Sequence, residues 1–179
     1  MAGLMIEGLP LWFTETNAWV VAPSGPGGEC VLIDPVGTSG MFGRYLEQAG
    51  LDVRPPELIE GLDDGERVSG AGMTFTVMHT PGHTQGSACL LLEIEGEQPV
   101  LFSGDHLFAG SIGRTDLPGG SYEQLMASME EKILPLDDEI PVLPGHGPAN
   151  RHDFDDLEAA FREWLADKAT GAFHGRPHR

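Results

Sequence analysis

The chain has 179 residues, of which 40% are hydrophobic and 21% are charged, and this composition is typical of a folded protein. We expect one domain over residues 1–170 and a flexible tail over residues 171–179. Its formal net charge of −18 repels phosphate backbones and anionic lipid surfaces, so it excludes nucleic acid and membranes as expected partners. No apolar run approaches the roughly 20 residues that span a bilayer, and the N-terminus lacks the pattern of a signal peptide, so we expect a cytoplasmic protein.

Apolar runs early in the chain predict strands. These runs cover residues 4–9, 11–22 and 30–33. The glycines and proline of residues 24–28 predict a turn before the last of them. A helix is expected next, because the apolar residues between positions 41 and 49 fall at helical spacing, with Thr38 or Ser39 as its cap and Gly50 as its stop.

The second half of the chain alternates short apolar runs with two helical patterns. Strands are predicted over residues 73–78, 87–94, 99–102 and 140–143. Ser121 and Gln124 have the spacing of a capping box that opens a helix reaching Ile133, and a last helix is expected from about Asp153. Strands outnumber helices, which predicts an α+β fold with helices packed outside two sheets.

Three loops that follow apolar strand-like runs carry side chains able to bind a metal ion. His83 ends the sequence HTPGH, Asp105 follows SG, and His146 lies in PGHG. Glycine and proline allow tight turns at these positions, so each side chain can project from a strand end toward a shared centre. Two imidazoles and one carboxylate are suitable ligands for zinc, and for iron in a site that keeps open positions.

The sequence resembles the metallo-β-lactamase superfamily, and within it the glyoxalase II-like (hydroxyacylglutathione hydrolase-like) branch. The motifs that carry this resemblance are TNAW at 16–19, LIDP at 32–35, HTPGHT at 79–84, GD at 104–105, GSIGRTDLPGG at 110–120 and LPGHG at 143–147. The resemblance implies an αββα sandwich with a metal site at one rim. It also implies that His83 binds a first metal, that Asp105 is the catalytic carboxylate between two metals, and that His146 binds the second.

The sequence departs from this family in one segment. Members carry a His-x-His-x-Asp-His signature at the end of the strand after the first helix, followed by a further helix and strand. Here only residues 51–54 separate the predicted helix from Pro55 and Pro56. Four of the usual seven ligands are therefore absent, including the aspartate that orients or deprotonates the attacking water. We expect one zinc ion rather than two, with iron as an alternative, bound by the three remaining ligands.

The loss of a strand-helix-strand segment shortens the sandwich. Such a change leaves a sheet edge unpaired and apolar surface exposed, so we expect either a homodimer formed through that edge or low stability.

Other polar residues near the three loops are expected to play smaller parts. His106 adjoins Asp105, and neighbouring side chains on an extended segment point to opposite sides, so the two are not expected to share one ion. Arg114 and Asp116 are expected to form a structural ion pair in preference to lining a substrate entrance. His79 is also expected in the family motif and does not replace a missing ligand.

Three functions are consistent with the sequence. The first is a metal-dependent hydrolase, in which a metal-bound water attacks the carbonyl of a small-molecule thioester or related ester. The second is a catalytically inactive relic or binding module that keeps the sandwich. The third is an iron-dependent persulfide dioxygenase, whose relatives also carry a GRTD segment.

Overall fold

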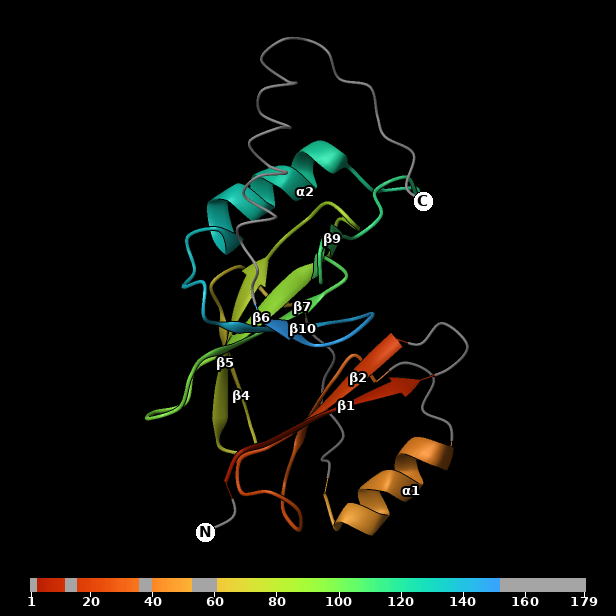
Figure 1. Ribbon diagram of the computed structural model, residues 1–179, viewed down its shortest axis with the longest axis vertical. Helices are drawn as coiled ribbons and strands as arrows, with labels where there is room; N and C mark the ends of the chain where they lie inside the picture. The colour runs from red at the N-terminus through yellow and green to blue at the C-terminus, as the bar shows by residue number, and fades with distance from the viewer. Residues whose placement is uncertain (1–2, 12–15, 36–39, 53–60, 152–179) are drawn as a thin grey trace.

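The computed structural model describes residues 3–11, 16–35, 40–52 and 61–151. Two sheets face each other, and one helix lies on the outer side of each sheet (Figure 1). This arrangement is the αββα sandwich expected from the sequence. In the described part of the chain, no helix is both long enough and apolar enough to cross a membrane.

The smaller sheet is an antiparallel meander of three strands. They are β1 (Met5–Leu11), β2 (Thr16–Ala22) and β3 (Val31–Ile33). The central strand β2 is buried on both faces: Ala18, Val20 and Ala22 pack toward helix α1 (Gly40–Ala49), while Trp19 and Val21 pack against the other sheet. A helix on one face and a sheet on the other explain why β2 has a continuous apolar run instead of an alternating pattern.

The larger sheet has six strands in the order β11-β10-β7-β6-β5-β4. Their bounds in chain order are β4 (Arg67–Gly70), β5 (Met73–His79), β6 (Ala88–Leu92), β7 (Val100–Gly104), β10 (Pro141–Pro144) and β11 (Asn150–Arg151). Strand β10 pairs with β7 in parallel, and the other neighbours are antiparallel. A separate small hairpin joins β8 (Leu107–Phe108) to β9 (Ser111–Ile112).

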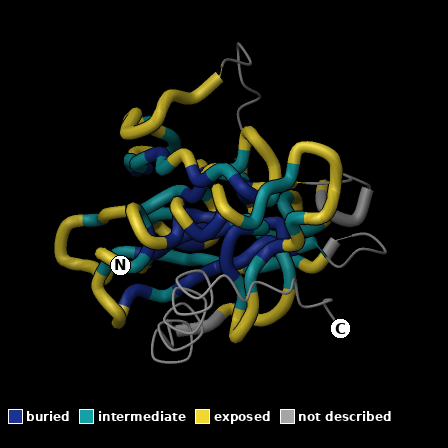
Figure 2. Tube along the Cα trace, turned by 90° about the horizontal axis from the view of Figure 1, so that it is seen from above, coloured by how far each residue is buried: buried dark blue, intermediate teal, exposed yellow. Residues whose placement is uncertain are grey.

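The core lies in two layers around the larger sheet. Between the sheets, the ring of Phe102 contacts those of Trp19 and Phe75, with centroids 6.3 and 6.2 Å apart. On the outer face, Cys89 and Leu101 pack beneath helix α2 (Tyr122–Ser128). Figure 2 shows the buried residues gathered in the middle of the molecule, with exposed loops around them.

Several elements differ from the expectations. The helix expected to continue to Ile133 changes after Ser128 into the π-helical turn η1 (Met129–Ile133). The Ser121 hydroxyl accepts a hydrogen bond from the Gln124 backbone, as a capping box requires, but the Gln124 side chain bonds Gln85 instead of reaching back. Strands β4, β8, β9 and β11 were not anticipated, because they are polar, exposed or only two residues long.

Some expectations fall outside the described residues. They are the Thr38 or Ser39 cap, the helix from about Asp153 and the tail over 171–179.

After helix α1 the chain returns to the smaller sheet. Asp52 forms a parallel bridge with Glu29, and its backbone bonds Cys30 and Gly28 at 3.1 and 2.9 Å. This single parallel bridge lies beside the residues that precede β3, just before the position where the sequence motifs imply the family's missing segment.

Candidate metal centre

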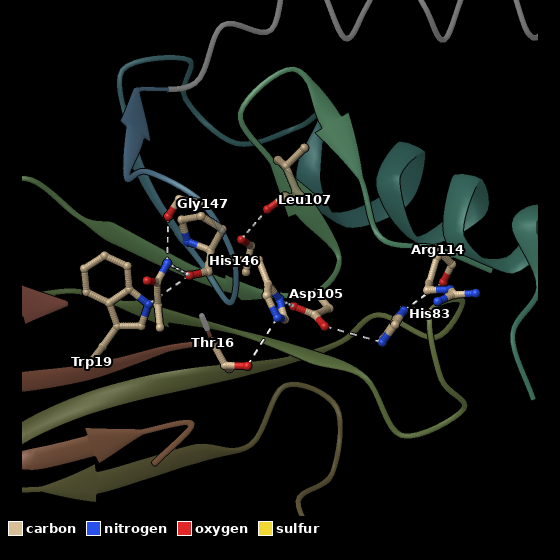
Figure 3. Close-up of polar contacts among 11 residues, drawn as sticks. Thr16, Trp19, His83, Asp105, Leu107, Arg114, His146 and Gly147 are labelled. Carbon is tan, nitrogen blue, oxygen red and sulfur yellow. Dashed lines mark hydrogen bonds and ion pairs between the residues drawn. The ribbon is translucent and has the colours of Figure 1, made fainter. Parts of the chain in front are cut away.

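The larger sheet brings His83, Asp105 and His146 to one edge. Strands β5 and β7 are both antiparallel to β6, and β10 is parallel to β7, so β5, β7 and β10 all run in the same direction. Each of the three residues lies in the loop after one of these strands. The strand direction therefore places their loops together, and the three side chains meet in Figure 3.

Asp105 lies between the two imidazoles. Its Oδ1 is 2.7 Å from His146 Nδ1, and its Oδ2 is 3.5 Å from His83 Nε2. The three side chains keep 17%, 29% and 38% of their surface exposed for His83, Asp105 and His146, so water reaches the site. One carboxylate that offers a separate oxygen to each histidine is the arrangement of a shared ligand.

The ring of His83 is oriented by a backbone carbonyl. Its Nδ1 lies 2.7 Å from the carbonyl oxygen of Arg114, and a carbonyl only accepts, so Nδ1 carries the proton. In the neutral ring Nε2 then has a bare lone pair, which faces a carboxylate oxygen of Asp105. Two facing lone-pair donors at this separation fit a cation between them, and metal-binding histidines commonly fix their second nitrogen in this way.

The ring of His146 is held at both nitrogens. Nδ1 meets Asp105, and Nε2 lies 3.2 Å from the hydroxyl oxygen of Thr16, which belongs to the smaller sheet. In this arrangement His146 Nδ1 donates a hydrogen bond to the carboxylate. Binding of one ion by all three residues requires that bond to be exchanged for a metal contact.

The loop that carries His146 is fixed by the smaller sheet. The side chain of Asn17 donates to the carbonyls of Pro144 and Gly147, at 3.0 and 2.8 Å. Trp19 Nε1 donates to the Pro144 carbonyl at 3.1 Å. These three bonds explain why the TNAW motif near the start of the chain accompanies the PGHG motif near its end.

Two glycines make room for Asp105. A Cβ at Gly145 would lie 2.5 Å from Asp105 Oδ1, and a Cβ at Gly113 would lie 1.8 Å from the Asp105 carbonyl oxygen. Both distances are shorter than any real contact, so side chains at these positions would displace the carboxylate or its backbone. The glycines of the PGHG and SIGR sequences thus both leave the space that Asp105 occupies.

Asp34 is a further acidic residue near this centre and was not among the predicted ligands. It ends β3 with a backbone φ of 52°, and its Oδ2 is 3.9 Å from the position of a Cβ on Gly104. Desolvation raises the pKa of Asp34, the charge of Asp105 raises it further, and His146 lowers it. The signals in the sequence are its place in the LIDP motif and at the end of an apolar run.

Among the residues that neighbour the three proposed ligands, one is buried in the core and the side chains of the others bond groups outside the centre. His106 is buried in the core, and neither ring nitrogen has a hydrogen-bond partner in the described part of the chain. Burial, with a smaller contribution from His83, lowers its pKa to about 4, so the ring is neutral at pH 7. Arg114 and Asp116 form the expected ion pair, and the His79 ring bonds the backbone of Gln85 away from the three residues.

The side chains of His83, Asp105 and His146 are of the types that bind metal ions, although their ligand atoms do not surround one common point. Two imidazoles and a carboxylate are ligands that zinc and iron accept. Across residues 3–11, 16–35, 40–52 and 61–151, no group of three His, Cys, Asp or Glu side chains is close enough to hold a metal without movement. His83 and Asp105 form a prepared pair, and one ion bound by all three stays a prediction.

Comparison with known proteins shows the same family that the motifs resemble. A model of the metallo-beta-lactamase superfamily matches residues 39–155. An uncharacterised protein of Mycobacterium tuberculosis is 40% identical over 126 residues, which cover 68% of this chain and 55% of that protein. The hydroxyacylglutathione hydrolase GloC of Haemophilus influenzae is 48% identical over 84 residues, covering 47% of this chain and 38% of GloC.

Solved structures agree with the fold. The protein TTHA1623, solved in a di-iron-bound form, superposes with a TM-score of 0.67 at 26% identity, covering 83% of this chain and 96% of that one. The chain spans about half the length, or less, of the two curated relatives.

Proposed function

The chain belongs to the metallo-beta-lactamase superfamily, and we propose that it acts as a metal-dependent hydrolase on a thioester or a related ester. The likeness to GloC, which is named a hydroxyacylglutathione hydrolase, supports this substrate class. The proposal concerns the described centre, since the matches cover only 55% of the mycobacterial relative and 38% of GloC.

The observation that carries the proposal is the position of Asp105. Its two oxygens face two imidazoles from different strands, and the bare Nε2 of His83 faces one of them. A carboxylate placed to hold a cation at the open edge of a sheet, within reach of water, suits hydrolysis better than structural support. The di-iron-bound form of TTHA1623, which shares the fold, supports a metal-binding role for the chain.

The residues of the chain have distinct parts in this reaction. His83, Asp105 and His146 would hold the ion, which would supply an acidified water and polarise the substrate carbonyl. The Arg114 carbonyl keeps the His83 proton on Nδ1, so that Nε2 remains the ligand. The Thr16 hydroxyl orients the ring of His146.

Metal analysis of the purified chain tests the proposal. After loading with zinc or with iron, we expect about one bound equivalent in the wild type, as a single three-ligand site predicts. Asp105→Asn should lose it, because the amide is a weaker ligand and carries no charge. Asp64→Asn is the matched control, since Asp64 pairs with Lys132 away from the centre.

Turnover of S-D-lactoylglutathione completes the test. The loaded wild type should hydrolyse this thioester, and His83→Ala should not. A wild type that binds neither metal would contradict the proposal and favour the inactive relic. Oxygen uptake with a persulfide, without thioester cleavage, would favour the dioxygenase.

A further inference from the structure

Arg114 is part of the candidate centre in two ways. Its carbonyl oxygen orients His83, and its side chain extends beyond that histidine, on the side away from Asp105 (Figure 3). The guanidinium is therefore fixed near the prepared pair of donors without competing for the position between them.

The guanidinium is held in one plane by Asp116. Nε and Nη2 donate to the two carboxylate oxygens at 2.8 and 2.7 Å, which is a bidentate contact along one edge of the group. A guanidinium has five N–H donors, and this contact uses two of them. The other three have no partner in the described part of the chain, and the side chain remains 56% exposed.

A fixed guanidinium with a free end suits a carboxylate ligand. The end formed by the two Nη atoms presents two parallel N–H donors, which match two carboxylate oxygens. Because Asp116 already restricts the side chain, less conformational entropy is lost when a second carboxylate binds.

The charge of the chain makes such a local donor necessary for an anionic substrate. The formal net charge is −18, which repels anions from most of the surface. Four basic side chains belong to residues whose burial is described: Arg44, Arg67, Arg114 and Lys132. Lys132 pairs with Asp64, and Arg114 is the one among them that contacts a residue of the centre.

We propose that the guanidinium of Arg114, held by Asp116, anchors a carboxylate of the substrate, so that the centre selects carboxylate-bearing thioesters over neutral ones. This inference rests on the proposed function for its substrate class. It assigns to the GRTD segment a part in recognition in addition to the ion pair.

Equilibrium binding tests the anchor without turnover. The probes are S-hexylglutathione, which carries two carboxylates, and its dimethyl ester, which carries none, titrated calorimetrically into the full chain. We expect the wild type to bind the diacid about tenfold more tightly, the effect of one charge-assisted bidentate contact. The preference should shrink between low and high salt, because the contact is exposed.

Variants separate recognition from structure. Arg114→Gln should bring the two probes within about twofold, and Arg114→Lys should recover only part of the preference, because an ammonium lacks the bidentate geometry. Arg67→Gln, which removes an exposed arginine from β4, is the matched control and should keep the full preference. Metal content should be unchanged in Arg114→Gln, because His83 is held by the backbone of that residue.

Kinetics then distinguish the two proposals. With the loaded chain, Arg114→Gln should raise KM about tenfold for S-D-lactoylglutathione and leave kcat within about twofold, as expected for loss of binding shared by ground state and transition state. Its KM for a neutral acetyl thioester should not change. A wild type with no preference between the probes, or that binds neither, overturns the anchor even if hydrolysis is observed. A preserved preference without hydrolysis contradicts only the proposed function.

Discussion

The two sheets contribute unequally to the candidate centre. The six-stranded sheet supplies all three proposed ligands from strand ends that point the same way. The three-stranded sheet supplies groups that hydrogen-bond His146 and its loop. Thr16 contacts the ring of His146, and Asn17 and Trp19 contact the loop that carries it. The proposed ligands and the groups that hold the His146 loop therefore come from different sheets.

The two sheets also differ in how their outer faces are packed. The larger sheet is covered by α2 and packs its outer face around fully buried residues such as Leu101 and Leu125. On the smaller sheet, α1 contributes the half-buried Tyr45 and Leu46. The layer under α2 therefore contains larger fully buried side chains than the layer under α1, where the fully buried residues are Ala18, Val20 and Ala22.

The largest expected effect tests this difference in packing. Leu101→Ala should lower the free energy of unfolding by about 2–5 kcal/mol, because it leaves a cavity in a fully buried layer. Leu46→Ala should cost less than half as much, since its side chain is only partly buried. Urea denaturation of both variants measures the ratio. Equal costs would show that the two layers are packed alike.

The second effect is the pH dependence of stability that comes from His106, which follows β7 of the larger sheet. His106 has a folded pKa of about 4, against 6.5 for the free side chain. Between these values the unfolded chain binds a proton that the folded chain does not, so stability should fall as the pH drops from 6.5 to 4. The contribution is about 3 kcal/mol at 1.36 kcal/mol per pKa unit. His106→Gln should flatten this part of the profile of unfolding free energy against pH, and an unchanged profile would contradict the assignment.

The third effect measures what the smaller sheet gives to the His146 loop. Asn17→Ala removes one buried and one partly buried hydrogen bond to backbone carbonyls, so we expect a loss of about 1–3 kcal/mol in unfolding free energy. Zinc affinity, measured by competition with a chelator, should fall as well. Ser69→Ala serves as the control, because its hydroxyl bonds Thr74 on an exposed strand. If Asn17→Ala loses stability but keeps its zinc affinity, the position of the His146 loop does not affect zinc binding.

The smallest effect concerns one hydroxyl. Thr16→Val keeps the shape of the side chain and removes the oxygen that meets His146 Nε2. We expect a loss of about 0.5–1.5 kcal/mol in stability, the usual value of one hydrogen bond. Nitrogen chemical shifts of the His146 ring should show a changed tautomer population. Shifts that match the wild type would show that Thr16 does not orient the ring.

Sequence patterns predicted the parts of the fold that follow from strand ends. His83, Asp105 and His146 each follow an apolar run, and the direction of the runs then determines that they meet. Asp34 could not be found this way, because its place near Asp105 depends on how the two sheets face each other. The change from α2 to η1 left no periodic signal, since Met129 and Ile133 are buried in either kind of helix.

The bridge between Glu29 and Asp52 has a consequence for protein engineering. The bridge places the backbone of Asp52 parallel to the residues just before β3, so an insertion after Asp52 would begin beside the smaller sheet. A graft carrying the His-x-His-x-Asp-His signature, placed between Asp52 and Gly61, would have its first hydrogen bonds made in advance. Recovery of a second bound metal in such a chimera would show that this chain retains the template of a binuclear centre.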